Sequence, residues 1–252
     1  MGDVVAKSGR DAISTRLGQL KAEYHCDFVI VNGENAAHGK GITTKIYNSL
    51  MQSGADVITL GNHAFSKSEI KDKFDLCPRL VRPYNMEVDE DCRSYVIVEA
   101  CGKRIAVTNV IGQIFMGELP TESPFSAMEN LLDEIDADII IVDLHGEATS
   151  EKELFLRVFS QDLTAVIGTH THVQTADEKI YNGCAFISDV GMCGPYNSVI
   201  GRDAEEVIRR LVRNEDTHFT PAEGDAILCG CVITIDDETN RAIAIERIQE
   251  RP

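Results

Sequence analysis

Short apolar runs alternate along the chain with segments in which apolar residues recur at helical spacing. Each run is four to six residues long, which is typical of a buried strand. The predicted strands of this kind are 27–31, 55–60, 138–142, 164–168 and 185–188. The predicted helices are 11–23, 43–52, 125–135, 150–159 and 204–212. The alternation indicates βα units and a mixed α/β fold.

Two further pairs of strand-like segments are separated only by turn residues, and this spacing predicts hairpins. The pairs are 95–100 with 104–110 and 227–235 with 242–248. Together with the βα units, the hairpins predict two sheets packed face to face with helices outside. Because no repeat, low-complexity segment or linker interrupts the sequence, we expect residues 1–252 to form a single domain.

Polar residues and one glycine mark several expected helix ends. Ser66 with Glu69, and Ser150 with Glu153, have the spacing of capping boxes, in which the two side chains satisfy free backbone N–H groups. Gly54 follows the helix predicted over 43–52 and is typical of a helix C-terminus. These signals predict that two helices begin directly after Ser66 and Ser150.

The overall composition narrows the classes of ligand. A net charge of −17 argues against a long nucleic-acid footprint, because phosphate binding along a polymer needs lysine and arginine. A small phosphorylated substrate is still compatible with this negative charge if bound cations make the electrostatic potential positive at the site. The sequence begins without a leader and contains no apolar run long enough for a membrane span, so a cytoplasmic protein is expected. Its eight cysteines are then expected to stay reduced.

Four of the seven histidines fall in three short motifs, each at the end of a predicted strand. The motifs are Gly61-Asn62-His63, Asp143-Leu144-His145 and Gly168-Thr169-His170-Thr171-His172, and the residues Asp3, Glu34 and Asn35 lie upstream. Since loops at the carboxyl ends of strands are where such folds place their chemistry, we expect these side chains to converge. Carboxylate, amide and imidazole groups together predict a hydrolytic site with two metal ions.

The spacing of these residues indicates individual roles. His170 and His172 lie two residues apart after a strand, so their side chains point the same way in extended backbone. Glu34 has two oxygens with which to bridge two cations, and Asn62 can bind through its amide oxygen. His63, next to Asn62, can reach the leaving group of a substrate. His38 with Lys40, and the stretch 188–194, are equally compatible with substrate contacts and with ordinary turns.

The first candidate ligand has an unusual place in the sequence. Asp3 is the third residue of the sequence and no apolar strand precedes it, whereas every other candidate ligand follows an apolar strand. We therefore predict that the first strand is missing or truncated.

The motifs resemble those of the calcineurin-like metallophosphoesterases. Longer strings are similar to the YmdB-like bacterial branch of that superfamily: 32–41 (NGENAAHGKG), 145–152 (HGEATSEK), 168–177 (GTHTHVQTAD) and 188–196 (SDVGMCGPY). The resemblance implies a four-layer αββα sandwich with a dinuclear site, commonly iron with manganese as a substitute. It also implies hydrolysis of small cyclic nucleotides, 2′,3′-cyclic and also 3′,5′-cyclic ones, by a hydroxide that bridges the two metals. Gly146 stands where this branch is expected to have alanine.

The resemblance also implies a role for each motif residue. One metal would be held by Asp3, Glu34, Asn35 and His172. Glu34 would bridge to a second metal, and His63 would be the catalytic proton donor. The remaining ligands of the second metal would be Asn62, His145 and His170.

Two alternatives stay open at this point. The same metal core would serve a phosphomonoesterase or nucleotidase, because pocket shape decides which bond is cleaved. The second alternative is a regulatory protein that retains the metals but catalyses no reaction. The ligand types suit iron, manganese and zinc alike, so they do not identify the metal. The sequence leaves the oligomeric state open, and a homo-oligomer is among the states that it allows.

Overall fold

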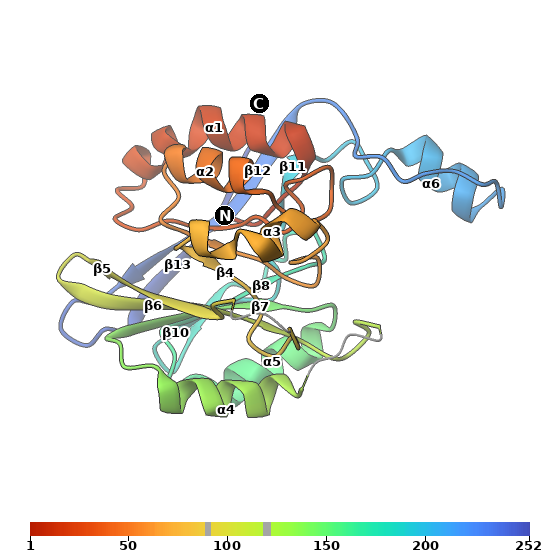
Figure 1. The fold of residues 1–252 in the computed structure, drawn as a ribbon. Coiled ribbons are helices and arrows are strands. Elements are labelled where there is room, and N and C mark those ends of the chain that lie inside the picture. Colours follow the sequence, from red (N-terminus) through yellow and green to blue (C-terminus); the bar gives the residue numbers. More distant parts are fainter. Residues whose placement is uncertain (89–91, 118–121) are drawn as a thin grey trace.

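Two β-sheet layers face each other and helices cover their outer sides (Figure 1). The computed structural model describes residues 1–88, 92–117 and 122–252. The helices are α1 (Ala6–Glu23), α2 (Thr44–Gln52), α3 (Ser68–Asp72), α4 (Pro124–Glu134), α5 (Thr149–Phe159) and α6 (Ala204–Leu211), with a 3-10 turn at Phe74–Leu76. Helices α1 and α2 cover one sheet layer, and α4 and α5 cover the other. The predicted four-layer αββα sandwich is confirmed.

The first sheet layer is built from two groups of strands that the N-terminal residue connects. One group has the order β1-β11-β12-β13 and the other the order β2-β3-β4. The strands are β1 (Asp3–Val4), β2 (Ile30–Asn32), β3 (Val57–Thr59), β4 (Leu80–Val81), β11 (Met192–Pro195), β12 (Ala226–Ile235) and β13 (Ala242–Glu250). The Met1 amino group donates to Ile30 O (2.8 Å), and Asn32 N donates to Met1 O (3.2 Å). Through these two bonds, Met1, which precedes β1, joins the β2 edge of one group to the β1 edge of the other.

The second layer is a six-stranded sheet with the order β5-β6-β7-β8-β10-β9. Its strands are β5 (Tyr95–Ala100), β6 (Lys103–Ile111), β7 (Ile139–His145), β8 (Ala165–Thr169), β9 (Lys179–Tyr181) and β10 (Cys184–Ile187). The neighbours β6, β7 and β8 pair in parallel, and β5 with β6 forms the predicted hairpin. The second predicted hairpin is also confirmed, as β12 with β13.

The first strand is short, but it is not loosely held. Strand β1 has two residues, and Asp3 is one of them. It pairs in parallel with β11, and Asp3 N donates to Gly191 O (3.1 Å). The Gly2 N–H donates to Cys229 O (3.0 Å), so the chain is fixed on the approach to Asp3 as well.

Both predicted capping boxes are wrong, although both helices exist. Helix α3 begins after Lys67 and α5 after Ala148, and neither has a side-chain cap. Glu69 instead accepts a hydrogen bond from the Thr44 hydroxyl (2.6 Å). Glu153 instead pairs with Lys179 (2.5 Å). Partners from other elements have displaced the local caps, because a side chain can satisfy only a few groups at once.

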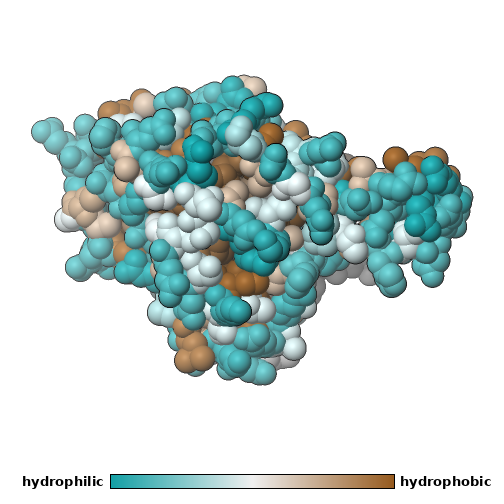
Figure 2. Space-filling model, turned by 90° about the horizontal axis from the view of Figure 1, so that it is seen from above, coloured by the Kyte–Doolittle hydropathy of each residue, from teal (hydrophilic) through white to brown (hydrophobic). Residues whose placement is uncertain are grey.

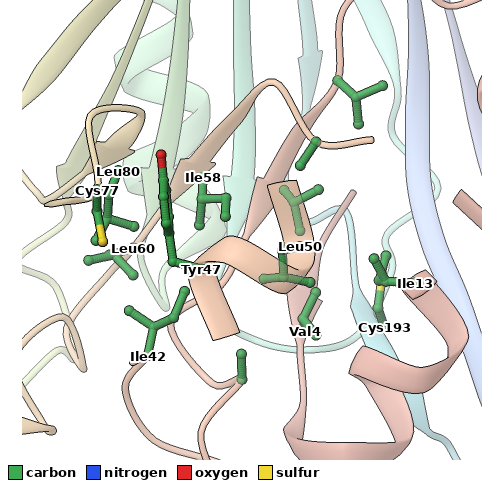
Figure 3. Packing of buried hydrophobic residues seen from close by; sticks show 14 of the residues in the cluster. Val4, Ile13, Ile42, Tyr47, Leu50, Ile58, Leu60, Cys77, Leu80 and Cys193 are labelled. Atoms are coloured by element: carbon green, nitrogen blue, oxygen red, sulfur yellow. The ribbon is translucent and has the colours of Figure 1, made fainter. Parts of the chain in front are cut away.

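The first helix layer is attached through a continuous apolar core. Figure 3 shows Tyr47 of α2 beside Ile58 of β3 and Ile13 of α1 beside Cys193 of β11, and Leu50 of α2 belongs to the same cluster. All five side chains are buried. Apolar spacing along α1 and α2 therefore determines how these helices lie on the sheet.

Truncation of one of these core residues should destabilise the protein strongly. Leu50→Ala is expected to lower the free energy of unfolding by about 2–5 kcal/mol, since it removes a buried side chain and leaves a cavity. Leu154→Ala, on the exposed side of α5, is the matched control and should change it by less than about 0.5 kcal/mol. Urea unfolding followed by circular dichroism measures both, and equal effects would contradict the packing described here.

Helix α6 projects from the body of the molecule (Figure 1). The surface seen from above is mainly hydrophilic, with a hydrophobic group near the end of this projection (Figure 2). Three apolar side chains of α6 and its C-cap are exposed: Ile208, Leu211 and Val212. In the described part of the chain, no helix combines the length and the hydropathy that a membrane crossing requires.

Candidate metal centre

The predicted site residues converge at the strand ends of the two facing layers. The first layer supplies the oxygen donors: Asp3 on β1, Glu34 and Asn35 just after β2, and Asn62 just after β3. The second layer supplies the imidazoles: His145 at the end of β7, and His170 and His172 just after β8. Distant parts of the sequence thus meet across the interface between the sheets.

One group of donors is compact enough to hold a metal ion. Ligand atoms of Glu34, His145 and His170 all lie within 4.8 Å of one another. His145 Nε2 is 3.2 Å from Glu34 Oε1, 2.8 Å from Asn62 Oδ1 and 3.1 Å from His170 Nδ1. These four residues are the ligand set predicted for the second metal, and the structure brings all of them together.

The set predicted for the first metal lies beside it. Asn35 Nδ2 is 3.1 Å from Glu34 Oε1, 3.1 Å from His172 Nε2 and 3.5 Å from Asp3 Oδ1. His172 Nε2 is 3.8 Å from Asp3 Oδ1. Asn35 therefore presents its amide nitrogen to the other three donors. A cation at this position would require the Asn35 side-chain amide to be flipped, because metal ions bind the amide oxygen and not the nitrogen.

The predicted proton donor lies at the edge of the cluster. His63 N donates to Glu34 Oε2 (3.0 Å), which anchors the residue to the predicted bridging carboxylate. Its side chain is half-buried, and burial lowers the pKa of its imidazole. The position is compatible with a group that reaches a substrate from one side.

The electrostatics of the cluster favour added positive charge. Burial raises the pKa of Asp3 to about 6. Burial opposes ionisation of Glu34 and His145, yet their mutual attraction and hydrogen bond lower the pKa of Glu34 to about 2 and help raise that of His145 to about 9. Burial and the neighbouring His145 lower the pKa of His170 to about 3. A proton on His145 thus provides, in part, the charge that a cation would supply.

A chain of hydrogen bonds behind His145 determines which ring nitrogen faces the cluster. The Thr169 hydroxyl donates to Asp143 Oδ1 (2.6 Å), so it accepts from His145 Nδ1 (2.8 Å). That bond leaves Nε2 directed at Glu34. Orientation of a ligand histidine by a group behind it is common in metal sites. Thr169, which connects His145 to Asp143, was not among the predicted site residues.

Asp143 also connects the two sheets. Its Oδ2 accepts from Asn32 Nδ2 (2.9 Å) and from the Thr59 hydroxyl (2.5 Å), both from the opposite layer. Asn32 in turn accepts from Glu34 N (3.1 Å). One buried carboxylate therefore holds the strand that precedes Glu34 against the strand that ends at His145.

The loop with the two histidines adopts an unfavourable backbone conformation. His170 has φ 101° and His172 has φ 66°, in the region that favours glycine. Each such residue costs about 1–3 kcal/mol, so surrounding contacts must hold it. His172 Nδ1 donates to Ile200 O (2.8 Å), which leaves Nε2 facing Asn35.

The predicted substrate contacts at 38–40 and 188–194 have different outcomes. His38 and Lys40 lie exposed in their turn, and no contact described by the structure gives them a role. The stretch 188–194 is buried and runs through a turn into β11. Its Asp189 was missed as a contact of the histidine loop, accepting from Thr171 N (2.9 Å). The available signal in the sequence was an aspartate in a glycine-bearing stretch that follows a predicted strand.

A glycine is required where the Gly61-Asn62-His63 motif passes the cluster. A Cβ on Gly61 would overlap Glu34 Oε2 and His145 Nε2, far inside contact distance. Gly61→Ala is therefore expected to lower kcat/KM for a phosphoester substrate about tenfold to 10²-fold, because displaced groups lose their alignment. Steady-state kinetics at saturating metal would measure the loss.

Gly146 offers the matched control for that substitution. A Cβ there would lie 3.5 Å from Gly112 Cα, an ordinary contact, so Gly146→Ala should keep activity close to the unsubstituted protein. This is the position where the related branch is expected to have alanine. A Gly61→Ala protein as active as Gly146→Ala would show that the cluster tolerates the extra methyl group.

Comparison with known proteins places the chain in a family. The family described as YmdB-like protein matches residues 1–248. A curated relative from Bacillus subtilis, a 2′,3′-cyclic-nucleotide 2′-phosphodiesterase, is 47% identical over 251 residues, which cover 98% of this chain and 94% of that protein.

Two solved structures have the same fold along the whole chain, each with a TM-score of 0.92. One is a hypothetical protein from Thermus thermophilus, 35% identical, covering 100% of this chain and 98% of that one. The other is described as a novel phosphatase from Mycoplasma pneumoniae, 38% identical, covering 100% of this chain and 92% of that one. The sequence and structural matches agree, and the chain belongs to the YmdB-like protein family.

Proposed function

We propose that this protein is a metal-dependent phosphodiesterase that hydrolyses small cyclic nucleotides, 2′,3′-cyclic ones first. The observation that carries the proposal is the convergence of Glu34, His145 and His170, whose ligand atoms lie within 4.8 Å of one another. The 47% identical phosphodiesterase from Bacillus subtilis supports the substrate class. The match over residues 1–248 also supports the proposal that 1–252 act as one domain.

The donor set fits divalent metal ions. Three nitrogen or oxygen atoms surround His145 Nε2 at 2.8–3.2 Å, in a buried place where a cation would relieve the repulsion between lone pairs. We propose two ions, iron or manganese, with Glu34 shared between them. One ion would use Asp3, Asn35 and His172, and the other would use Asn62, His145 and His170.

When bound, such ions would supply Lewis-acid stabilisation of the phosphoryl charge and lower the pKa of an attacking water. The side chains of this protein would do the rest. Asn62 would help to stabilise the charge on the phosphoryl oxygens, and buried Asp143 keeps the Nε2 atom of His145 directed at the site through Thr169. His63, anchored to Glu34 by its backbone, would protonate the ribose oxygen that leaves.

Hydrolysis of 2′,3′-cyclic AMP by protein loaded anaerobically with Fe(II) or with Mn(II) tests the proposal, with metal content quantified on the same samples. Turnover with about two metals per chain would support it. Full metal occupancy without turnover of any cyclic nucleotide would refute the phosphodiesterase and favour a non-catalytic, regulatory role.

A phosphomonoesterase is the second candidate. The observation in its favour is the relative from Mycoplasma pneumoniae, 39% identical over 260 residues, which is named a putative phosphatase/phosphodiesterase. A panel of nucleoside monophosphates and cyclic diesters, compared by kcat/KM under the same metal loading, separates the two activities.

A further inference from the structure

A buried ion pair lies against the backbone of the loop that carries His170 and His172. Lys152 comes from α5, and Asp189 follows β10. Their side chains are each only 1% exposed, and Lys152 Nζ is 3.3 Å from Asp189 Oδ2. Neither residue belongs to the ligand sets proposed above. Burying two charges has a desolvation cost, so their place beside the site calls for a structural explanation.

The pair holds the loop on both sides of His170. Lys152 Nζ donates to Thr169 O (2.7 Å), and Asp189 Oδ2 accepts from Thr171 N (2.9 Å). The other oxygen, Asp189 Oδ1, accepts from Gly191 N (2.8 Å) in the turn before β11. The backbone groups before and after the histidine are therefore both tied to one buried unit, which is itself tied to the neighbouring layer.

The loop needs such a restraint. Its two histidines have φ values of 101° and 66°, which residues other than glycine rarely adopt. A relaxed loop would rotate the imidazoles away from Glu34 and Asn35. Because strained residues persist only where surrounding contacts determine them, the ties at Thr169 and Thr171 select the conformation in which both rings face the cluster.

The same contacts account for two sequence strings that the proposed ligand sets leave mostly unused. Lys152 is the last residue of the string 145–152, and Asp189 is the second of the string 188–196. Each string thus contributes one half of the pair. The lysine supplies a donor for the carbonyl, and the aspartate neutralises it and accepts the amide.

We propose that Lys152 and Asp189 are positioning residues that hold the 169–172 loop in its left-handed conformation, so that His170 and His172 are preorganised for metal binding. The inference rests on the proposed function, because it assumes that these histidines bind metal. It assigns the ion pair no contact with substrate.

Metal binding by Lys152→Met tests the proposal directly. The substitution keeps the length of the side chain and removes the donor. Calorimetric titration of metal-free protein with Mn(II) should show binding weakened about 10- to 100-fold, the usual effect of losing a group that orients a ligand. Activity should recover at saturating Mn(II), because the ligands themselves are intact.

Lys21→Met is the matched control. It removes the lysine of another ion pair, Lys21 with Asp56 (3.0 Å), which joins α1 to the start of β3 and touches no site residue. Its Mn(II) affinity should equal that of the unsubstituted protein. A purely structural role for Lys152 would lower the melting temperature and leave the Mn(II) affinity of the folded protein unchanged, and that result would overturn the proposal.

A double variant protects the test against loss of folding. In Lys152→Met with Asp189→Asn no buried charge is left unpaired, and the asparagine can still accept one backbone N–H. A folded double variant with the affinity of the unsubstituted protein would also overturn the proposal. Since Mn(II) binding is measured without turnover, an unsubstituted protein that binds Mn(II) but cleaves no cyclic nucleotide would refute the proposed function alone.

Discussion

Glu34→Gln is expected to lose metal and activity together, with kcat reduced by at least about 10³-fold. Glu34 is 1% exposed, and its carboxylate touches His145, Asn35 and the backbone of His63. The neutral amide keeps the shape but removes the one charge that both proposed ions would share. A loss of about 4 kcal/mol of transition-state stabilisation corresponds to about 10³-fold in rate.

Metal content by plasma emission spectrometry and kcat for 2′,3′-cyclic AMP measure this prediction. Glu151→Gln is the matched control, because Glu151 is another buried glutamate, 5% exposed, that accepts from Gln113 N (3.0 Å) outside the cluster. It should keep its metal content. If Glu34→Gln retained two metals and full turnover, the bridging role of Glu34 would be refuted.

His63→Ala is expected to lower kcat about 10²- to 10⁴-fold while metal content stays the same. The residue is held at the cluster by its backbone N–H, which the substitution preserves. Only the imidazole is lost, and with it the proposed proton for the leaving ribose oxygen. An alkoxide is a poor leaving group, so the effect on a cyclic nucleotide should be large.

A substrate whose leaving group departs without protonation distinguishes proton donation by His63 from a role of His63 in substrate binding. With bis(p-nitrophenyl) phosphate the departing group is already a weak base, so His63→Ala should be much less impaired on it than on 2′,3′-cyclic AMP. His25→Ala, at an exposed histidine at the end of α1, provides the control for the loss of an imidazole elsewhere. Equal losses on both substrates would argue against proton donation.

The cluster is assembled from two sheet layers, so its geometry depends on how these layers pack. Oxygen donors come from the layer of β1, β2 and β3, and imidazoles come from the layer of β7 and β8. Asp143 connects these layers through Asn32 and Thr59. The metal centre therefore depends on how the two sheets face each other, and a change at their interface would reach the site without touching a ligand.

The family resemblance predicted the αββα layers, and the apolar pattern predicted most of the strands and helices. Continuous apolar runs of strand length ended at the motif residues, so the convergence of Glu34, Asn62, His145 and His170 followed from βα geometry. Strands β4, β9 and β11 were not predicted, since two to four residues carry too little pattern. The ligand roles stay predictions, because the structure gives their proximity and not their chemistry.

Side-chain partners across the fold could not be predicted in the same way. Glu69 and Glu153 had the spacing of local caps, yet each found a partner from another element. Thr169 and Asp189 carried no motif of their own, and only their neighbours in space gave them a role.

The sequence by itself determined most of the element types and the identity of the donors, because these depend on local periodicity and on residue chemistry. Tertiary structure alone decided which nitrogen of His145 faces the cluster, how two-residue β1 holds Asp3, and why a buried Lys152–Asp189 pair is tolerated. Hydrogen bonds between distant segments make these choices, and they exist only after the sheets have packed.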